Sequence, residues 1–116
     1  MFALIHLLLG GLIGEYVHSV LFIILLSMLS HFFLDMIPHW DFGIGWRGKN
    51  KITLFAESIL DLVVGIILAY LIFGRNVDPI YFLACIFFSE IWDILMMPYL
   101  LFSWKFPPFS TAYQFQ

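Results

Sequence analysis

The sequence predicts an all-α protein, a single integral membrane domain of residues 1–116 built as a polytopic bundle of about four transmembrane helices. The chain is 63% hydrophobic and only 11% charged, whereas soluble domains carry about 25% charged residues. A chain of 116 residues has too much surface for its volume to bury that much apolar side chain in one core, so the lipid bilayer is the expected solvent for the excess.

The first apolar block covers about residues 2–37, which is too long for one crossing of a hydrocarbon core about 30 Å thick. We expect it to break near Gly14 and to form one helix over about 2–14 and a second over about 18–37. The first helix is short for a full crossing, and the sequence leaves open whether it is tilted, half-buried or re-entrant. Gly10 and Gly14 have the small-xxx-small spacing that lets another helix approach closely.

The second half of the chain predicts two further helices. Pro38 ends the second helix because its ring nitrogen cannot donate to the helical hydrogen-bond ladder, and a polar loop follows to residue 51. A third helix is expected over about 52–73 and a fourth over about 80–102, joined by the compact turn GRNVDP. The tail after the fourth helix has two adjacent prolines and no long apolar run.

Orientation in the membrane follows from the basic residues, because cytoplasmic loops are enriched in Lys and Arg. Arg47, Lys49 and Lys51 lie in the loop between the second and third helices, and Lys105 follows the fourth helix on the same side. Arg75 alone lies on the opposite side. The distribution predicts that loop 38–51 and the C-terminus are cytoplasmic.

Net charge and motifs exclude several classes of function. The net charge is −3 and there is no basic run, so nucleic acid is not an expected partner. The single cysteine, Cys85, cannot form an intramolecular disulfide. The chain has no Gly-x-Ser-x-Gly elbow, Walker loop or dinucleotide fingerprint.

Acidic residues are the unusual feature of the apolar segments. The chain has eight acidic residues, and most of them lie within or at the edge of the predicted helices: Glu15, Asp35, Glu57, Asp61, Glu90 and Asp93. All five basic residues lie outside these segments. A charge at bilayer depth costs at least about 2.5–3.5 kcal/mol, so we expect these acids to be protonated or to bind cations.

The spacing of the polar residues favours a shared metal site. Three helices each carry a pair three or four residues apart, which places both members on one helix face: His31 and Asp35, Glu57 and Asp61, and Glu90 and Asp93. Such pairs on facing helices build metal sites in four-helix bundles. We predict a divalent metal, with Zn²⁺, Mn²⁺, Fe²⁺ and Mg²⁺ left open, held by His31, Asp35, Asp61, Glu90 and Asp93. Glu57 and His39 are candidates for the general base.

Other polar residues have simpler interpretations. For His6 the sequence favours a packing or surface role over a ligand role. Glu15 and His18 are explained about equally well by a polar turn, and Asp41 by solvation in a loop. For His39 the sequence favours equally a role near the site and a role at the end of the second helix.

At residues 30–41, SHFFLDMIPHWD, the chain resembles the small inner-membrane proteins of bacteria and archaea called YdjM-like, or membrane-bound metal-dependent hydrolases. Their His-Leu-x-x-Gly opening corresponds to residues 6–10, HLLLG, and their Ser-His-x-x-x-Asp motif to Ser30, His31 and Asp35. Their acidic pair corresponds inexactly to SEIWD at 89–93, and their His-Arg-Gly-x-x-His-Ser element is missing. The resemblance implies a polytopic protein of a prokaryotic inner membrane with metal-dependent hydrolase activity.

Three functions follow from these observations. The first is a membrane metallohydrolase that acts on a lipid, or on another phosphate or acyl ester, at the cytoplasmic membrane face. The second is a proton or cation transporter or channel subunit that uses the intramembrane carboxylates, which in so small a chain would require a homo-oligomer. The third is a non-enzymatic membrane assembly subunit whose polar residues hold helices together.

Overall fold

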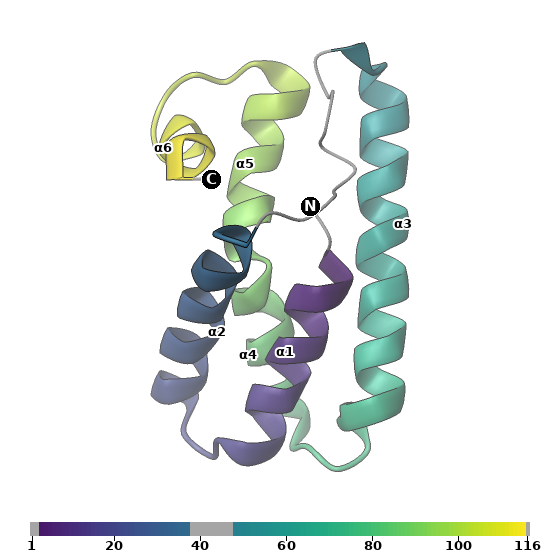
Figure 1. Cartoon of the computed structure of the whole chain (residues 1–116), viewed down its shortest axis with the longest axis vertical. Coiled ribbons are helices and arrows are strands. Elements are labelled where there is room, and N and C mark those ends of the chain that lie inside the picture. Colours follow the sequence, from purple (N-terminus) through teal and green to yellow (C-terminus); the bar gives the residue numbers. More distant parts are fainter. Residues whose placement is uncertain (1–2, 38–47, 116) are drawn as a thin grey trace.

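The computed structural model describes residues 3–37 and 48–115, and within these ranges the chain is helical without any β-strand, which confirms the all-α class (Figure 1). The helices in chain order are α1 (Ala3–Tyr16), α2 (Val20–Asp35), α3 (Lys51–Ala69) with its π-helical continuation η2 (Tyr70–Gly74), α4 (Pro79–Ser89), α5 (Ile91–Phe102) and α6 (Phe109–Phe115).

The first two helices form a short antiparallel hairpin. The chain turns between Tyr16 and Val20, close to the break expected near Gly14. The two helices have 14 and 16 residues, which gives lengths of about 21 and 24 Å. They lie beside only the lower part of α3 in Figure 1, so the start of α1 and the end of α2 both lie about halfway along it.

The glycine spacing in α1 allows the close approach to another helix that the sequence predicts. A Cβ atom added to Gly10 would lie 3.1 Å from Ser89 Oγ, and one added to Gly14 would lie 2.9 Å from Cys85 Sγ. Both contacts belong to α4. The small residues therefore let the backbones of α1 and α4 come together along the hairpin.

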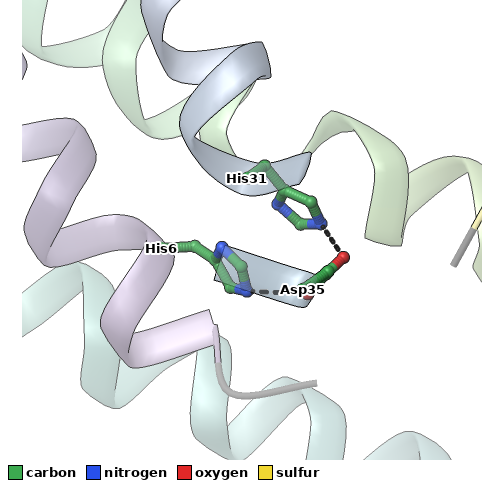
Figure 2. A group of neighbouring side chains, drawn as sticks. All are labelled: His6, His31 and Asp35. Atoms are coloured by element: carbon green, nitrogen blue, oxygen red, sulfur yellow. Dashed lines mark ion pairs between the residues drawn. The ribbon is translucent and has the colours of Figure 1, made fainter. Parts of the chain in front are cut away.

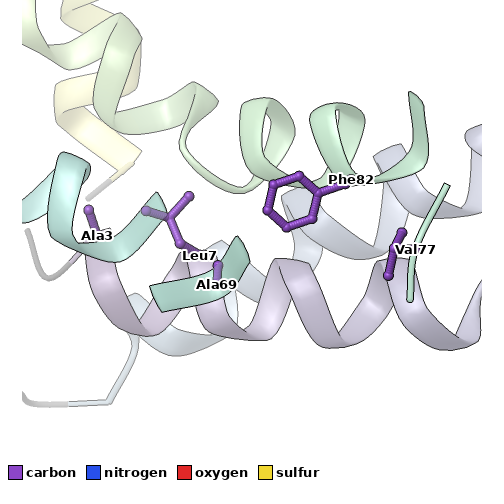
Figure 3. Close-up of a cluster of buried hydrophobic side chains, with 5 residues drawn as sticks. All are labelled: Ala3, Leu7, Ala69, Val77 and Phe82. Carbon is purple, nitrogen blue, oxygen red and sulfur yellow. The ribbon is translucent and has the colours of Figure 1, made fainter. Parts of the chain in front are cut away.

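α1 also packs against α3, where Gly65 provides the space. A Cβ atom at Gly65 would lie 3.0 Å from the Cα atom of Leu4. Around this crossing α1, α3, α4 and the loop before α4 build the main hydrophobic core (Figure 3), which consists of Ala3, Leu7, Ala69, Val77 and Phe82.

α3 with η2 is the longest helix of the molecule. It begins where the Asn50 side chain accepts a hydrogen bond from the Ile52 amide, which caps the helix. The 24 residues Lys51–Gly74 have a mean hydropathy of 2.2 in their most apolar stretch, of which only 28% is buried. Among the described residues this is the one unbroken helix long and apolar enough to cross a membrane. Large side chains such as Ile52 and Leu60 are exposed along it.

The predicted helix over 80–102 is wrong as a single element. The structure has two helices, α4 and α5, bent by 42° at a break at Glu90. Asp78 caps the start of α4 and Pro79 occupies its first turn, as helix N-termini favour. At Glu90 the backbone leaves the helical region, with φ −109° and ψ 2°, so the regular ladder stops there.

A sixth helix, absent from the sequence prediction, folds back on α5. Ser103 ends α5 in the left-handed conformation with φ 60°, which reverses the chain. The rings of Tyr99 and Tyr113 stack with their centroids 4.2 Å apart. A second small core forms where α3, α5 and α6 meet, from Leu54, Met96, Leu100 and Ala112.

Candidate functional site

Three interruptions of helical structure meet about halfway along α3. They are the start of α1 with His6, the end of α2 with His31 and Asp35, and the break between α4 and α5 (Figures 1 and 2). Helix ends and breaks supply backbone groups that are not used within the helix. Polar side chains can therefore gather here in a molecule that is otherwise apolar.

His6, His31 and Asp35 form a compact triad. His6 Nε2 lies 3.3 Å from Asp35 Oδ1, and His31 Nε2 lies 3.1 Å from Asp35 Oδ2. The two imidazole rings stack with centroids 4.0 Å apart and an interplanar angle of 21°. The side chains of His6 and His31 are 2% and 1% exposed, whereas that of Asp35 is 22% exposed. The triad is thus buried on the histidine side and open on the carboxylate side.

The hydrogen bond of His31 to the helix break fixes the chemistry of its ring. His31 Nδ1 lies within hydrogen-bonding distance of the Ser89 carbonyl oxygen. A carbonyl oxygen only accepts, so Nδ1 carries the proton. In the neutral imidazole Nε2 then presents a lone pair towards the carboxylate of Asp35. Two electron-rich atoms 3.1 Å apart require a proton or a cation between or beside them.

The spacing of the triad fits a metal ion. One ligand atom from each of the three residues lies within 4.8 Å of the others. Metal–ligand bonds of about 2.1 Å in a tetrahedral site place ligand atoms about 3.4 Å apart; each imidazole Nε2 lies at 3.1 or 3.3 Å from a carboxylate oxygen of Asp35, the two distances running to different oxygens. A histidine that donates Nδ1–H to a carbonyl and binds metal through Nε2 is the usual arrangement in metal sites.

A second polar region adjoins the triad on the side of α3. Asp93 Oδ1 lies 3.8 Å from His31 Nε2. A cavity of about 140 Å³ lies next to it and is lined partly by Asp61, Glu90 and Asp93. Asp61 accepts a hydrogen bond of 2.7 Å from the Ala3 amide, which joins α3 to the start of α1. Glu90 is 2% exposed, and its Oε1 has no hydrogen-bond partner among the described residues.

The structure divides the predicted ligands into two groups. His31 and Asp35 lie together in the triad, and Asp93 lies beside it. Asp61 and Glu90 line the adjoining cavity. Among the described residues the compact ligand group has His6 as its third member, although the sequence favoured a packing role for it. The one feature of the sequence that could have indicated a ligand role for His6 is its position at the start of the HLLLG segment.

Of the two predicted general bases, the structure describes Glu57. Glu57 forms an ion pair of 2.6 Å with Lys49, which differs from the expectation that the acids of the apolar segments lack basic partners. Its catalytic role stays a prediction. His39 and Asp41 lie outside the described residues. His18 is remote from the triad, and its carbonyl accepts a hydrogen bond of 3.3 Å from the Tyr81 hydroxyl.

Comparison of the chain with protein families, curated proteins and solved structures finds no match.

Proposed function

We propose that the chain is a membrane-embedded metalloprotein whose triad His6, His31 and Asp35 binds a divalent transition metal ion. The observation that carries the proposal is the hydrogen bond of His31 Nδ1 to the Ser89 carbonyl, which leaves Nε2 facing the carboxylate of Asp35. Two imidazoles and one carboxylate suit Zn²⁺, Mn²⁺ or Fe²⁺ better than Mg²⁺, which prefers oxygen ligands.

We propose further that α3 crosses the membrane once and that α4 and α5 together form a broken second crossing. In this arrangement α1 and α2 form a hairpin in the half of the bilayer next to the turn between η2 and α4, with the start of α1 and the end of α2 at about mid-depth (Figure 1). Support comes from the apolar side chains exposed on α3 and from the 42° bend of the α4–α5 pair. Irregular backbone within a membrane is tolerated where protein buries it, and the break at Glu90 is buried.

The proposed activity is metal-dependent hydrolysis of a lipid, or of another phosphate or acyl ester, at the triad about halfway along α3 (Figure 1). A bound divalent ion makes a coordinated water nucleophilic near neutral pH. In this chain His6, His31 and Asp35 would hold the ion, the Ser89 carbonyl orients His31, and Asp93 lies close enough to accept a proton near the site. The resemblance to YdjM-like membrane hydrolases points the same way.

The test compares the metal content and hydrolytic activity of the purified protein with those of two variants. Wild type, Asp35→Asn and His18→Gln are purified without chelator, soaked in Zn²⁺, Mn²⁺ or Fe²⁺ and analysed by mass spectrometry for bound metal. Phosphate and carboxylate esters are then assayed with the ion retained. We expect about one ion per chain and turnover in wild type and His18→Gln, and loss of both in Asp35→Asn because the amide lacks the carboxylate charge.

A second function, proton or cation transport, is favoured by the three buried carboxylates that line one cavity at the helix break. Intramembrane acids are typical of ion and proton paths. The same experiment separates the two functions. Absence of stoichiometric metal in all three proteins would reject the metalloprotein, and the acids would then be assigned to transport.

A further inference from the structure

The segment that joins α5 to α6 carries a cluster of aromatic side chains that the proposed metal chemistry does not use. We call residues 102–109 the aromatic turn. The ring of Trp104 lies at its centre, with its centroid 5.6 Å from that of Phe102, 5.7 Å from that of Phe106 and 5.4 Å from that of Phe109. Phe102, Trp104 and Phe106 are 64%, 45% and 54% exposed. The cluster is therefore a contiguous apolar surface on the outside of the molecule.

The backbone of the aromatic turn is unsuited to the hydrocarbon core of a bilayer. Residues 103–108 are all exposed and lie outside the helices. The amides of Lys105 and Phe106 donate no hydrogen bond to another backbone group among the described residues. Lipid tails do not satisfy such groups, so exposed irregular backbone does not occur in the hydrocarbon region. The charge of Lys105 is costly there for the same reason.

The side chains of the aromatic turn are unsuited to bulk water, because contiguous exposed rings cost free energy there and usually mark a binding surface. The head-group layer between water and hydrocarbon accommodates both features. Tryptophan is enriched in that layer, where its ring is in apolar surroundings and its indole N–H can donate a hydrogen bond. Lys105 can lay its methylene groups along the lipid and keep its ammonium group among the phosphates.

The position of the aromatic turn agrees with the head-group layer. The two helices of the α4–α5 pair have 11 and 12 residues, which gives about 35 Å of helix, and they are bent by 42°. A hydrocarbon core about 30 Å thick therefore ends at about Phe102. Leu100 packs in one cluster with Leu54 of α3. Figure 1 shows the chain after α5 arching at the same end of the molecule as the start of α3, so both proposed crossings end at this level.

We propose that the aromatic turn binds the phospholipid head-group layer, with the rings of Phe102, Trp104 and Phe106 at the boundary with the lipid tails and the Lys105 ammonium group against lipid phosphates. The inference rests on the membrane arrangement in the proposed function, because α5 has to leave the hydrocarbon core at Phe102. It adds a partner for residues 102–109 and a role for them, which is to hold the end of α5 at a fixed depth. Since α5 begins directly after Glu90, the same contact fixes the depth of the helix break beside the triad.

Depth-dependent quenching of tryptophan fluorescence tests the proposal in the full-length protein. The protein is reconstituted in phosphatidylcholine–phosphatidylglycerol vesicles whose acyl chains carry bromine close to the head group, in mid-chain or near the methyl end. The contribution of Trp104 is the emission of wild type minus that of Trp104→Phe, which keeps an aromatic ring at the position. We expect this contribution to be quenched most by bromine close to the head group and least by bromine near the methyl end.

Trp92 is the matched control on the same helix. It lies about 15 Å from Phe102 along α5, so the emission of wild type minus that of Trp92→Phe should be quenched most by bromine near the methyl end. A second variant moves the indole within the cluster. Phe106→Trp combined with Trp104→Phe should give a contribution with the same shallow profile as that of Trp104. None of these measurements needs bound metal or turnover.

The outcomes separate this inference from the proposed function. Quenching of the Trp104 contribution by aqueous iodide and by no brominated lipid would overturn the head-group contact, as would strongest quenching by bromine near the methyl end. Quenching by none of these agents would also overturn it and indicate that a second copy of the chain covers the rings. A shallow profile for both Trp104 and Trp92 would keep the contact and reject the crossing by α5. A shallow Trp104 in a protein that binds no metal would keep the contact and reject the metalloprotein.

Discussion

The two ring nitrogens of His31 have different partners, and their roles can be separated by substitution. Nδ1 donates to the Ser89 carbonyl, and Nε2 faces Asp35 at 3.1 Å. Asparagine carries a side-chain N–H at about the position of Nδ1, whereas glutamine reaches about as far as Nε2. Asparagine therefore keeps the hydrogen bond to Ser89, and glutamine keeps a polar atom at the proposed metal position.

We expect His31→Asn to retain the fold and lose the ion. Loss of an outer hydrogen bond to a ligand typically weakens metal binding about 10–100-fold, so loss of the ligand itself should weaken Zn²⁺ binding by more than about 100-fold. Zn²⁺ affinity by chelator competition and the thermal midpoint of the metal-free protein are the measurements. His31→Gln should bind Zn²⁺ more tightly than His31→Asn but unfold at a lower temperature. Wild-type affinity in His31→Asn would show that Nε2 is not a ligand.

At the scale of helices, the position of the triad depends on how closely α1 approaches α3. Gly65 lies opposite the backbone of Leu4, two residues before His6. Leucine has a better helix propensity than glycine by up to about 1 kcal/mol. If the crossing had room, a leucine would therefore stabilise α3. Because the added Cβ would lie 3.0 Å from Leu4 Cα, the backbones have to separate instead.

We expect Gly65→Leu to destabilise the protein by about 1–3 kcal/mol, the usual cost of overpacking, and to weaken metal binding because His6 moves with α1. Unfolding in a graded detergent titration measures the stability. Gly48→Leu is the control, since a Cβ atom there meets nothing within 4 Å. An increase in stability for Gly65→Leu would mean that α1 does not pack closely on α3.

The sequence predicts the helices well where apolar runs have clear ends and less well where a helix is broken from within. Asn50 and the Asp78–Pro79 pair mark the starts of α3 and α4 through ordinary capping. No glycine or proline lies at Glu90, so the sequence does not indicate the break there. Pro98, which would be expected to end a helix, instead lies inside α5. The hydrogen bond between His31 and the Ser89 carbonyl is a tertiary contact, and the spacing of apolar residues along the sequence does not predict it.

The candidate site was predictable where it depends on spacing within one helix, and not where it depends on contacts between helices. The i, i+4 spacing brings His31 and Asp35 together within one helix, and the structure keeps them together. The position of His6 depends on the α1–α2 hairpin and its glycine contacts, which single-helix spacing does not specify. Asp61 and Glu90 share a helix face with their sequence partners, but depth along α3 and the break at Glu90 place them in the adjoining cavity.

For the molecule as a whole, the proposed arrangement in the membrane can be tested at the two ends of α3. The turn between η2 and α4, which contains Arg75 and Asn76, lies at one end of α3, and the start of α3 and the end of α5 lie at the other (Figure 1). Gly48 and Ser103 lie near that second end, beside Lys49 and Lys105. The basic residues predict that this second end is cytoplasmic.

Single cysteines introduced at Gly48, Asn76 and Ser103 test this arrangement, because the natural Cys85 is buried and gives wild type as an unlabelled control. In intact bacterial cells that express the protein, a membrane-impermeant maleimide should label Asn76→Cys alone. In inverted vesicles it should label Gly48→Cys and Ser103→Cys but not Asn76→Cys. The exchange of labelling between the two preparations requires an odd number of crossings between residues 48 and 76 and again between 76 and 103. Labelling of all three variants in inverted vesicles and of none in intact cells would mean that neither α3 nor the α4–α5 pair crosses the bilayer, and the triad would then have to be placed at the membrane surface.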